Sequence, residues 1–248
     1  AISQSGMNLP RGLAYDSVND RLFVADSQSH RVLVFDTATI VNGENAINVL
    51  GQTDFVSGAA TVSQSRMSTP VSLAYDSTNS RLFVAQTGGN RVTVYDVASI
   101  TNGENAVNVL GQSNFTATTA ANTQTGMNQP RGLAYDLANS RLFVAQGNNR
   151  VTVYNAAIGT LIPNGAGNGA NATAVLGQAT YTATTAANTQ AGMNQPQGLT
   201  YESANTRLFV AQSGNNRVTV YDVASITNGE NAVNVLGQAN FTATTAAN

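Results

Sequence analysis

The sequence predicts an all-β fold built from four copies of one unit. The landmarks Met7, Met67, Met127 and Met193 lie 60, 60 and 66 residues apart, and self-similarity at such a period is typical of repeat architectures. Each unit contains short runs rich in β-branched and aromatic residues that are separated by turn residues, whereas helical periodicity is missing. We expect one domain, with units at residues 1–60, 61–120, 121–186 and 187–248.

Four strands are expected in each unit, and the links between them carry turn signals. The link Ser17–Asp20 suits a tight hairpin between the first two strands. The second link is rich in Gly, Asn and Ser, and the third carries Asn-Gly-Glu-Asn from Asn42, Asn102 and Asn228. In the first unit the expected strands are Gly12–Asp16, Arg21–Asp26, Arg31–Asp36 and Ala46–Gly51.

The second strand of each unit decides the architecture. In Leu22-Phe23-Val24-Ala25 both alternating faces are apolar, whereas an antiparallel sheet with one wet face should alternate apolar with polar residues. Four-stranded antiparallel sheets packed between two like sheets make a β-propeller. A sandwich is the alternative, but it does not account for four like units. We expect a closed four-bladed ring, with a larger propeller or a head-to-tail fibre as alternatives.

The motifs of the unit resemble those of the NHL repeat. These motifs are Pro-x-Gly-Leu-Ala-Tyr-Asp, Arg-Leu-Phe-Val-Ala, Asn-Arg-Val-x-Val-Tyr-Asp and Val-Leu-Gly-Gln. The resemblance implies a four-stranded propeller blade, in which an Asp after the second strand partners a later Arg. Asp26 keeps that acid, and Gln86, Gln146 and Gln212 replace it. For function it implies protein binding, RNA binding or, less often, catalysis.

Composition narrows the choice of partner. Charged residues are only 10% of the chain, the net charge is −2, and all 11 basic residues are Arg. No basic face for nucleic acid is expected, and no apolar run is long enough for membrane insertion. Cys is missing, which excludes disulfides and thiolate chemistry. The Lys-free, Asn- and Thr-rich composition favours an extracellular or cell-surface protein.

Acidic and basic residues recur at one predicted rim of the blades. Antiparallel pairing places the ends of the first and third strands beside the start of the second. Two carboxylates could serve acid–base chemistry, but an Arg between them favours a structural ion network. The expected groups are Asp16, Arg21 and Asp36; Asp76, Arg81 and Asp96; Asp136 and Arg141; and Glu202, Arg207 and Asp222.

The opposite rim holds the candidate ligand site. The residue after each strand-opening Pro should lie near the axis, where Arg11 and Arg131 would face each other with Gln197 beside them. Such a pair could bind an anion or be solvated. The following position is always small, which would let strands crowd the axis; its residues are Gly12, Ser72, Gly132 and Gly198.

The sequence offers few individual residues that could form a catalytic or metal site. His30 is the only histidine and is expected in a surface loop. A zinc site normally needs more ligands of this kind, so neither a metal nor a cofactor is expected. Asn-x-Thr sequons at Asn114, Asn171 and Asn240 are candidate glycosylation sites. The third unit has a longer link, residues 164–171, expected as a surface loop.

Together these features favour a non-catalytic binding or structural scaffold. Its partner would be a protein, a glycan or another copy of the chain. A lyase or hydrolase with its site at the mouth of the channel is the alternative.

Overall fold

The computed structural model describes residues 2–159 and 167–246, which form four four-stranded antiparallel sheets. In every sheet the strands pair in chain order, and we call each sheet a blade. Residues 164–166 of the long link in the third unit lie outside the described residues.

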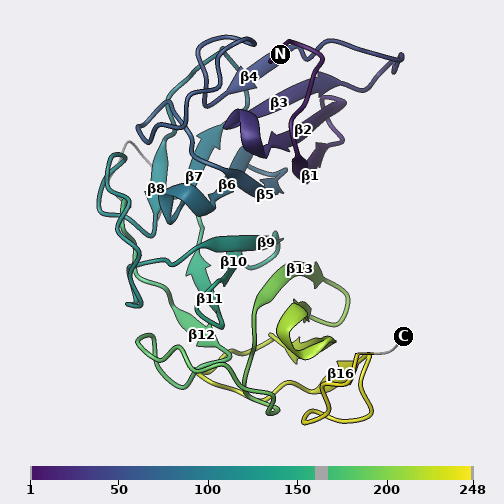
Figure 1. Ribbon diagram of the computed structural model, residues 1–248, viewed down its shortest axis with the longest axis vertical. Coiled ribbons are helices and arrows are strands. Elements are labelled where there is room, and N and C mark those ends of the chain that lie inside the picture. The colour runs from purple at the N-terminus through teal and green to yellow at the C-terminus, as the bar shows by residue number, and fades with distance from the viewer. Residues whose placement is uncertain (1, 160–166, 247–248) are drawn as a thin grey trace.

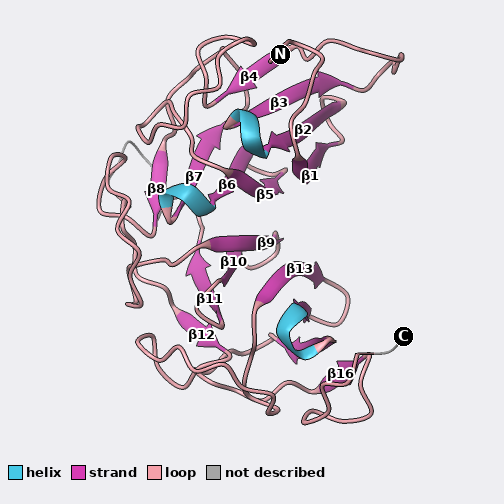
Figure 2. Ribbon diagram, viewed as in Figure 1, coloured by secondary structure: helices cyan, strands magenta, loops and turns pink. Residues whose placement is uncertain are grey.

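Blades 1 and 2 contain β1 (Pro10–Asp16), β2 (Arg21–Asp26), β3 (Arg31–Asp36), β4 (Asn48–Leu50), β5 (Pro70–Asp76), β6 (Arg81–Gln86), β7 (Arg91–Asp96) and β8 (Asn108–Leu110). Blades 3 and 4 contain β9 (Pro130–Asp136), β10 (Arg141–Gln146), β11 (Arg150–Asn155), β12 (Ala174–Leu176), β13 (Pro196–Glu202), β14 (Arg207–Gln212), β15 (Arg217–Asp222) and β16 (Asn234–Leu236). Short 3-10 helices follow β2, β6 and β14, at η1 (Ser27–Ser29), η2 (Thr87–Gly89) and η3 (Ser213–Asn215) (Figure 2).

The expected strands agree with the structure in number and order, but β1 begins at Pro10 rather than at Gly12, and the fourth strand is shorter than expected. Strands β2 and β3 have the predicted bounds, whereas β4 is three residues long. Ala46 donates its N–H to the carbonyl of Gln4, so it does not take part in the ladder. Gly51 has a φ of +82°, a left-handed conformation that ends the strand and that suits glycine.

Apolar cores lie between consecutive blades. The front face of a blade, defined here as the face toward the following blade, carries Phe23, Ala25, Val32, Val34 and Leu50 in blade 1. It packs against the back face of the next blade, which in blade 2 carries Leu73, Leu82, Val84, Tyr95 and Val97. The same arrangement recurs between blades 2 and 3 and between blades 3 and 4. Both faces of the interior sheets are therefore covered, as the apolar second strand predicted.

The ring is not closed in this structure. Inner strand β1 packs on β5, β5 on β9, and β9 on β13. Among the described residues no comparable packing joins β1 to β13, and the blades form an open arc (Figure 1). The all-β propeller architecture is confirmed, but the expected closure of four blades into a ring is not. Blade sequence determines how neighbours pack, whereas closure also depends on the angle between blades.

Candidate functional site

The residues after the strand-opening prolines gather at one cavity. Arg11, Val71, Arg131 and Gln197, one from each inner strand, line a cavity of about 710 Å³. A register shift in each inner strand just after its proline marks a β-bulge, which re-aims side chains at a strand end. The remaining lining residues are Thr69, Thr87, Gly88 and Gln129.

The cavity is basic. Its lining contains two Arg side chains and no carboxylate. Arg131 donates from Nη2 to Oε1 of Gln129 at 3.1 Å, and Arg11 is exposed. Within the described residues, neither arginine belongs to one of the four salt bridges. Two cations without acidic neighbours, beside Gln and Thr side chains, suit carboxylate groups of a ligand.

Small residues do allow the inner strands to crowd together. A Cβ added to Gly12 would lie 2.6 Å from the Cα of Ser72, and one added to Gly132 would meet the carbonyl of Gln197. Ser72 uses its hydroxyl to accept the N–H of Leu133 at 3.1 Å. These contacts hold neighbouring strands together at the cavity.

The opposite rim carries ion pairs. Asp16 pairs with Arg21 at 2.6 Å, Asp76 with Arg81 at 2.5 Å, and Asp136 with Arg141 at 2.6 Å. Burial opposes ionisation of Asp16, but hydrogen bonds from Asn19, Arg21 and the adjacent backbone prevail and lower its pKa to about 2. The carboxylates are therefore ionised and held by donors.

These pairs also join blades. Arg81 donates from Nη2 to the carbonyl of Ala156 at 2.6 Å, and the hydroxyl of Tyr135 donates to Asp76 at 3.0 Å. Likewise, Arg141 donates to the carbonyl of Val223 at 2.6 Å. Arg81 and Arg141 thus connect their own blades to the next.

The second acid of each expected group has a different role. Asp36, Asp96 and Asp222 lie across the ladder from the Arg, but they are exposed and accept backbone N–H groups two residues ahead. In blade 4, Glu202 accepts from Asn205, and no salt bridge to Arg207 forms among the described residues. The structure therefore shows Asp–Arg pairs in three blades rather than trios.

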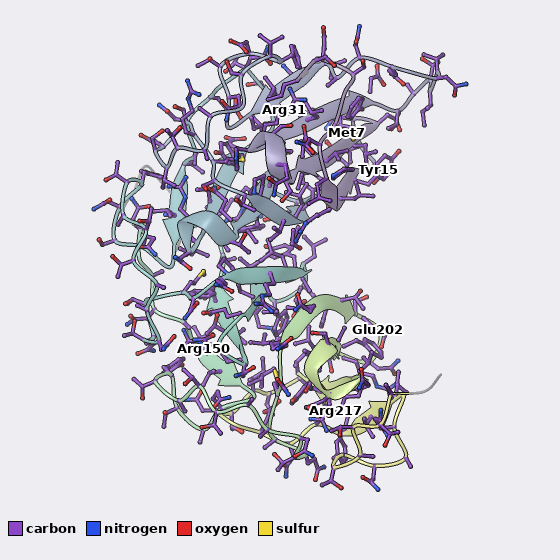
Figure 3. The ribbon with its side chains drawn as sticks, in the orientation of Figure 1. Met7, Tyr15, Arg31, Arg150, Glu202 and Arg217 are labelled. Carbon is purple, nitrogen blue, oxygen red and sulfur yellow. The ribbon has the colours of Figure 1, made fainter. Side chains whose placement is uncertain are left out.

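A buried arginine opens the third strand of every blade. Figure 3 labels those of blades 1, 3 and 4, Arg31, Arg150 and Arg217. Arg31 bonds to Asp26 at 2.8 Å. It also donates to the carbonyl of Phe55 in the link to blade 2 and to the carbonyls of Ser3 and Gly6 in the segment before β1. Arg91, Arg150 and Arg217 make the equivalent contacts.

In blades 2–4 this arginine has a neutral partner. Gln86 accepts from Arg91 at 3.1 Å, and its amide donates to the hydroxyl of Thr93 at 2.7 Å. Burial lowers the pKa of Arg91 to about 10. In blade 1 a carboxylate replaces the amide, and Leu33 replaces the threonine. A carboxylate at Asp26 has no N–H to donate, so blade 1 needs no hydroxyl acceptor at the position of Leu33.

His30 connects blades 1 and 2. It is half-buried in a left-handed conformation after η1, and its Nδ1 accepts the N–H of Thr69 at 3.0 Å. Burial lowers its pKa, although the charge of Asp26 opposes this. Asn90 and Asn149 accept the equivalent N–H groups from the next blades. The residue is thus more than a solvated loop side chain.

The sequons are accessible. Asn114, Asn171 and Asn240 are exposed, and Asn114 and Asn240 accept backbone N–H groups within their turns. In the described part of the chain, no helix is long and apolar enough to span a membrane. Nor do three or more His, Cys, Asp or Glu side chains group there in a way that would hold a metal.

The Asn-Gly motif, which the sequence predicts only as a turn, also joins neighbouring blades. Asn102 accepts the N–H of Val49 at 3.0 Å, and Gly103 donates to the carbonyl of the same residue at 3.0 Å. The Asn-Gly turn of one blade therefore clasps the outer strand of the preceding blade. The sequence signal for this contact is that the Asn-Gly turn recurs in the units together with the strand motif Val-Leu-Gly-Gln.

The comparison with protein families agrees with this geometry. The model of the NHL repeat matches residues 7–35, which comprise β1, β2 and nearly all of β3. In the comparison with curated proteins, none matches the chain significantly.

Proposed function

We propose that the chain, whose residues 7–35 match the NHL repeat and whose four blades share one topology, is a non-catalytic scaffold that binds a protein partner through an acidic segment. The observation that carries the proposal is the cavity that Arg11, Arg131 and Gln197 line without a carboxylate. Arg forks bind carboxylates by paired hydrogen bonds. The open form of the cavity suits an extended peptide or a loop better than a small enclosed substrate.

The rim carboxylates support the non-catalytic part of the proposal. Burial raises the pKa of Asp76, but hydrogen bonds from Asn79, Arg81 and Tyr135 outweigh it and leave the pKa lowered. A general acid near neutral pH would need a raised pKa. Asp16 and Asp136 have comparable donors. These acids serve the fold.

A peptide-binding measurement tests the partner class. A fluorescently labelled hexaglutamate peptide should bind the chain, and the double substitution Arg11→Ala and Arg131→Ala should abolish binding. Arg207→Ala is the matched control, since Arg207 is an exposed arginine outside the cavity. A hexalysine peptide should not bind. Equal binding by wild type and the double variant would contradict the proposal, and binding of neutral oligosaccharides alone would indicate a glycan partner instead.

We further propose that the protein acts outside the cell or at its surface, where it also associates with copies of itself. The composition and the exposed sequons Asn114, Asn171 and Asn240 support the location. Mass spectrometry of the protein expressed through a secretory pathway should find glycan on at least one of the three. Retention inside the cell without glycan would contradict the location.

A further inference from the structure

The two ends of the arc present unpaired halves of the contact that joins neighbouring blades. On blade 1 the back face is open, with Leu13 61% exposed, whereas Leu73 and Leu133 at the same position of blades 2 and 3 are buried. On blade 4 the front face is open, with Leu236 51% exposed, whereas Leu50 and Leu110 are buried. Figure 3 shows Met7 and Tyr15 at one end of the arc and Glu202 at the other.

The open faces have the residues that pack inside the array. The front face of blade 4 has Phe209, Ala211, Val218, Val220 and Leu236, the same residue types as the buried front faces of blades 2 and 3. Leu236 is exposed, Phe209, Ala211 and Val218 are half-buried, and Val220 is buried. The back face of blade 1 matches that of blade 2 at most positions, with Leu13, Tyr15, Leu22, Val24 and Phe35. Leu13 and Tyr15 are exposed, Leu22 is half-buried, and Val24 and Phe35 are already buried within blade 1.

A methionine socket is also unfilled. Met67, Met127 and Met193 are buried and lie over a glycine of the preceding blade, where an added Cβ would meet their side chains. Gly237 occupies this glycine position in blade 4, and no methionine lies over it among the described residues. Met7 is 44% exposed. Blade 1 therefore carries the methionine that the socket on blade 4 fits.

The Asn-Gly clasp likewise lacks its partner strand at one end of the arc. Asn102, Asn168 and Asn228 each accept the N–H of the central residue in the outer strand of the preceding blade. Asn42 and Gly43 repeat the motif on blade 1, yet apart from Gly43 and its chain neighbours no described atom lies within 4 Å of a Cβ built on Gly43. The outer strand that is left without a clasp is β16 of blade 4, because no described blade follows its central residue Val235.

We infer that the front face of blade 4 binds the back face of blade 1 from a second copy of the chain, head to tail. Met7 then covers Gly237, the clasp at Asn42 and Gly43 holds Val235, and Leu13 packs over Phe209 and Leu236. A second copy is the partner that these sockets fit, because every interior blade boundary already makes this contact. Such a heterologous contact closes into a ring or propagates.

Two capping variants test the inference. Leu13→Glu blocks only the back face of blade 1, and Leu236→Glu blocks only the front face of blade 4; both side chains are exposed, so folding should survive. In light scattering the wild type should exceed its 25.7 kDa chain mass increasingly with concentration. Each variant alone should be monomeric. Mixed, the two variants should form a 1:1 dimer that does not grow, because one intact pair of faces remains.

Leu137→Glu is the matched control, since Leu137 is similarly exposed but lies in a turn of blade 3. It should associate as the wild type does. A wild-type mass that stays at that of one chain at every concentration would overturn the inference, as would failure of the mixed variants to pair. This contact deepens the self-association in the proposed function and is separate from the basic cavity. Binding of hexaglutamate by the monomeric variants therefore tests the cavity independently.

Discussion

The buried arginines show how one side chain selects its neighbour. In blade 1 a carboxylate accepts from Arg31 and from the backbone N–H of Asn8. In blade 2 the amide oxygen of Gln86 accepts the equivalent pair, from Arg91 and Ser68. The amide also has a donor to satisfy, and a buried donor without a partner costs about 1–3 kcal/mol.

We expect strong coupling between Gln86 and Thr93. Gln86→Asp leaves the hydroxyl of Thr93 unpaired, and Thr93→Leu leaves the amide donor of Gln86 unpaired, so each change should cost about 1–2 kcal/mol. The double variant recreates the pair found in blade 1 and should regain most of that loss. Urea unfolding of the four proteins gives the coupling energy, expected at about 1–2 kcal/mol. Additive losses would show that the two positions act independently.

His30 should give the contact between blades 1 and 2 a pH dependence. Its Nδ1 accepts from Thr69 only when the imidazole is neutral, and burial places its folded pKa below 6.5. The unfolded chain therefore takes up this proton first as the pH falls. The contribution of His30 to stability is complete above pH 6.5 and is lost as the pH falls toward its folded pKa.

The variant His30→Asn provides the comparison, because asparagine accepts the same kind of bond in blades 2 and 3. Urea unfolding between pH 5 and 8 should show wild type losing stability relative to this variant below pH 6.5. Other titrating groups, including the facing Asp26, are common to both proteins. A stability difference that stays constant over the range would show that His30 does not titrate with folding.

At the scale of the strand, the Asp–Arg pair fixes the hairpin and the boundary to the next blade. Arg81→Leu should destabilise the protein by about 3 kcal/mol, because Asp76 and the carbonyl of Ala156 stay buried without their cation. Arg207→Leu is the control in blade 4, where the arginine is exposed, and should cost less than about 0.5 kcal/mol.

The pH dependence of the destabilisation by Arg81→Leu tests whether loss of the Asp76–Arg81 ion pair causes it. The pKa of Asp76 is lowered in the folded wild type, so its pairing stabilises the fold above the unfolded pKa and is lost in acid. The deficit of Arg81→Leu should therefore shrink as the pH falls below 4. Equal costs for Arg81→Leu and Arg207→Leu at neutral pH would show that the pair is merely solvated.

Strand positions could be predicted because each strand is short, apolar and bounded by turn residues. Strands β2 and β3 begin at Arg and end at Asp or its replacement, and pairing in chain order follows from the short links. The shortness of β4 could not be predicted, because it depends on Gln4, which precedes the sheet in the chain.

For the candidate sites, the positions of residues could be predicted from the sequence, but their hydrogen-bond partners could not. The strand-opening Pro and the small residue after Arg11 and Arg131 placed those arginines at the axis, and the structure brings them to one cavity. The exact partners of charged side chains could not be read from register alone. Asp96 lies opposite Arg81 in the ladder, yet it accepts the backbone N–H of Ala98 in its own turn, while Arg81 donates to Asp76 and to the carbonyl of Ala156.

For the whole molecule, repeats determine the blade boundary but not the number of blades. The same front face recurs in blades 2, 3 and 4, so sequence cannot distinguish an interior face from an end face. Closure depends on a small rotation at each boundary, and this accumulates over the array. That is why the expected ring was not confirmed, although each boundary packs as predicted.

The nearly identical segments of blades 2 and 4 allow the last prediction. Residues 91–122 and 217–248 differ only at Ser113 and Ala239, so their intrinsic amide exchange rates are nearly equal. The N–H of Val109 bonds to Asn168 of the next blade, whereas Val235 meets no following blade in the described structure. In the monomeric variant Leu13→Glu, β16 should exchange its amides at least about tenfold faster than β8.

Hydrogen exchange read by mass spectrometry measures this difference. Peptides that extend into Thr87 or Ser213 distinguish the two copies by mass. In concentrated wild type the exchange of β16 should slow toward that of β8, because a second copy then covers the strand. Equal exchange of β8 and β16 in the monomer would show that each outer strand is held by its own blade alone. The clasp between blades would then contribute nothing to stability, and the head-to-tail contact would lose its strongest hydrogen bonds.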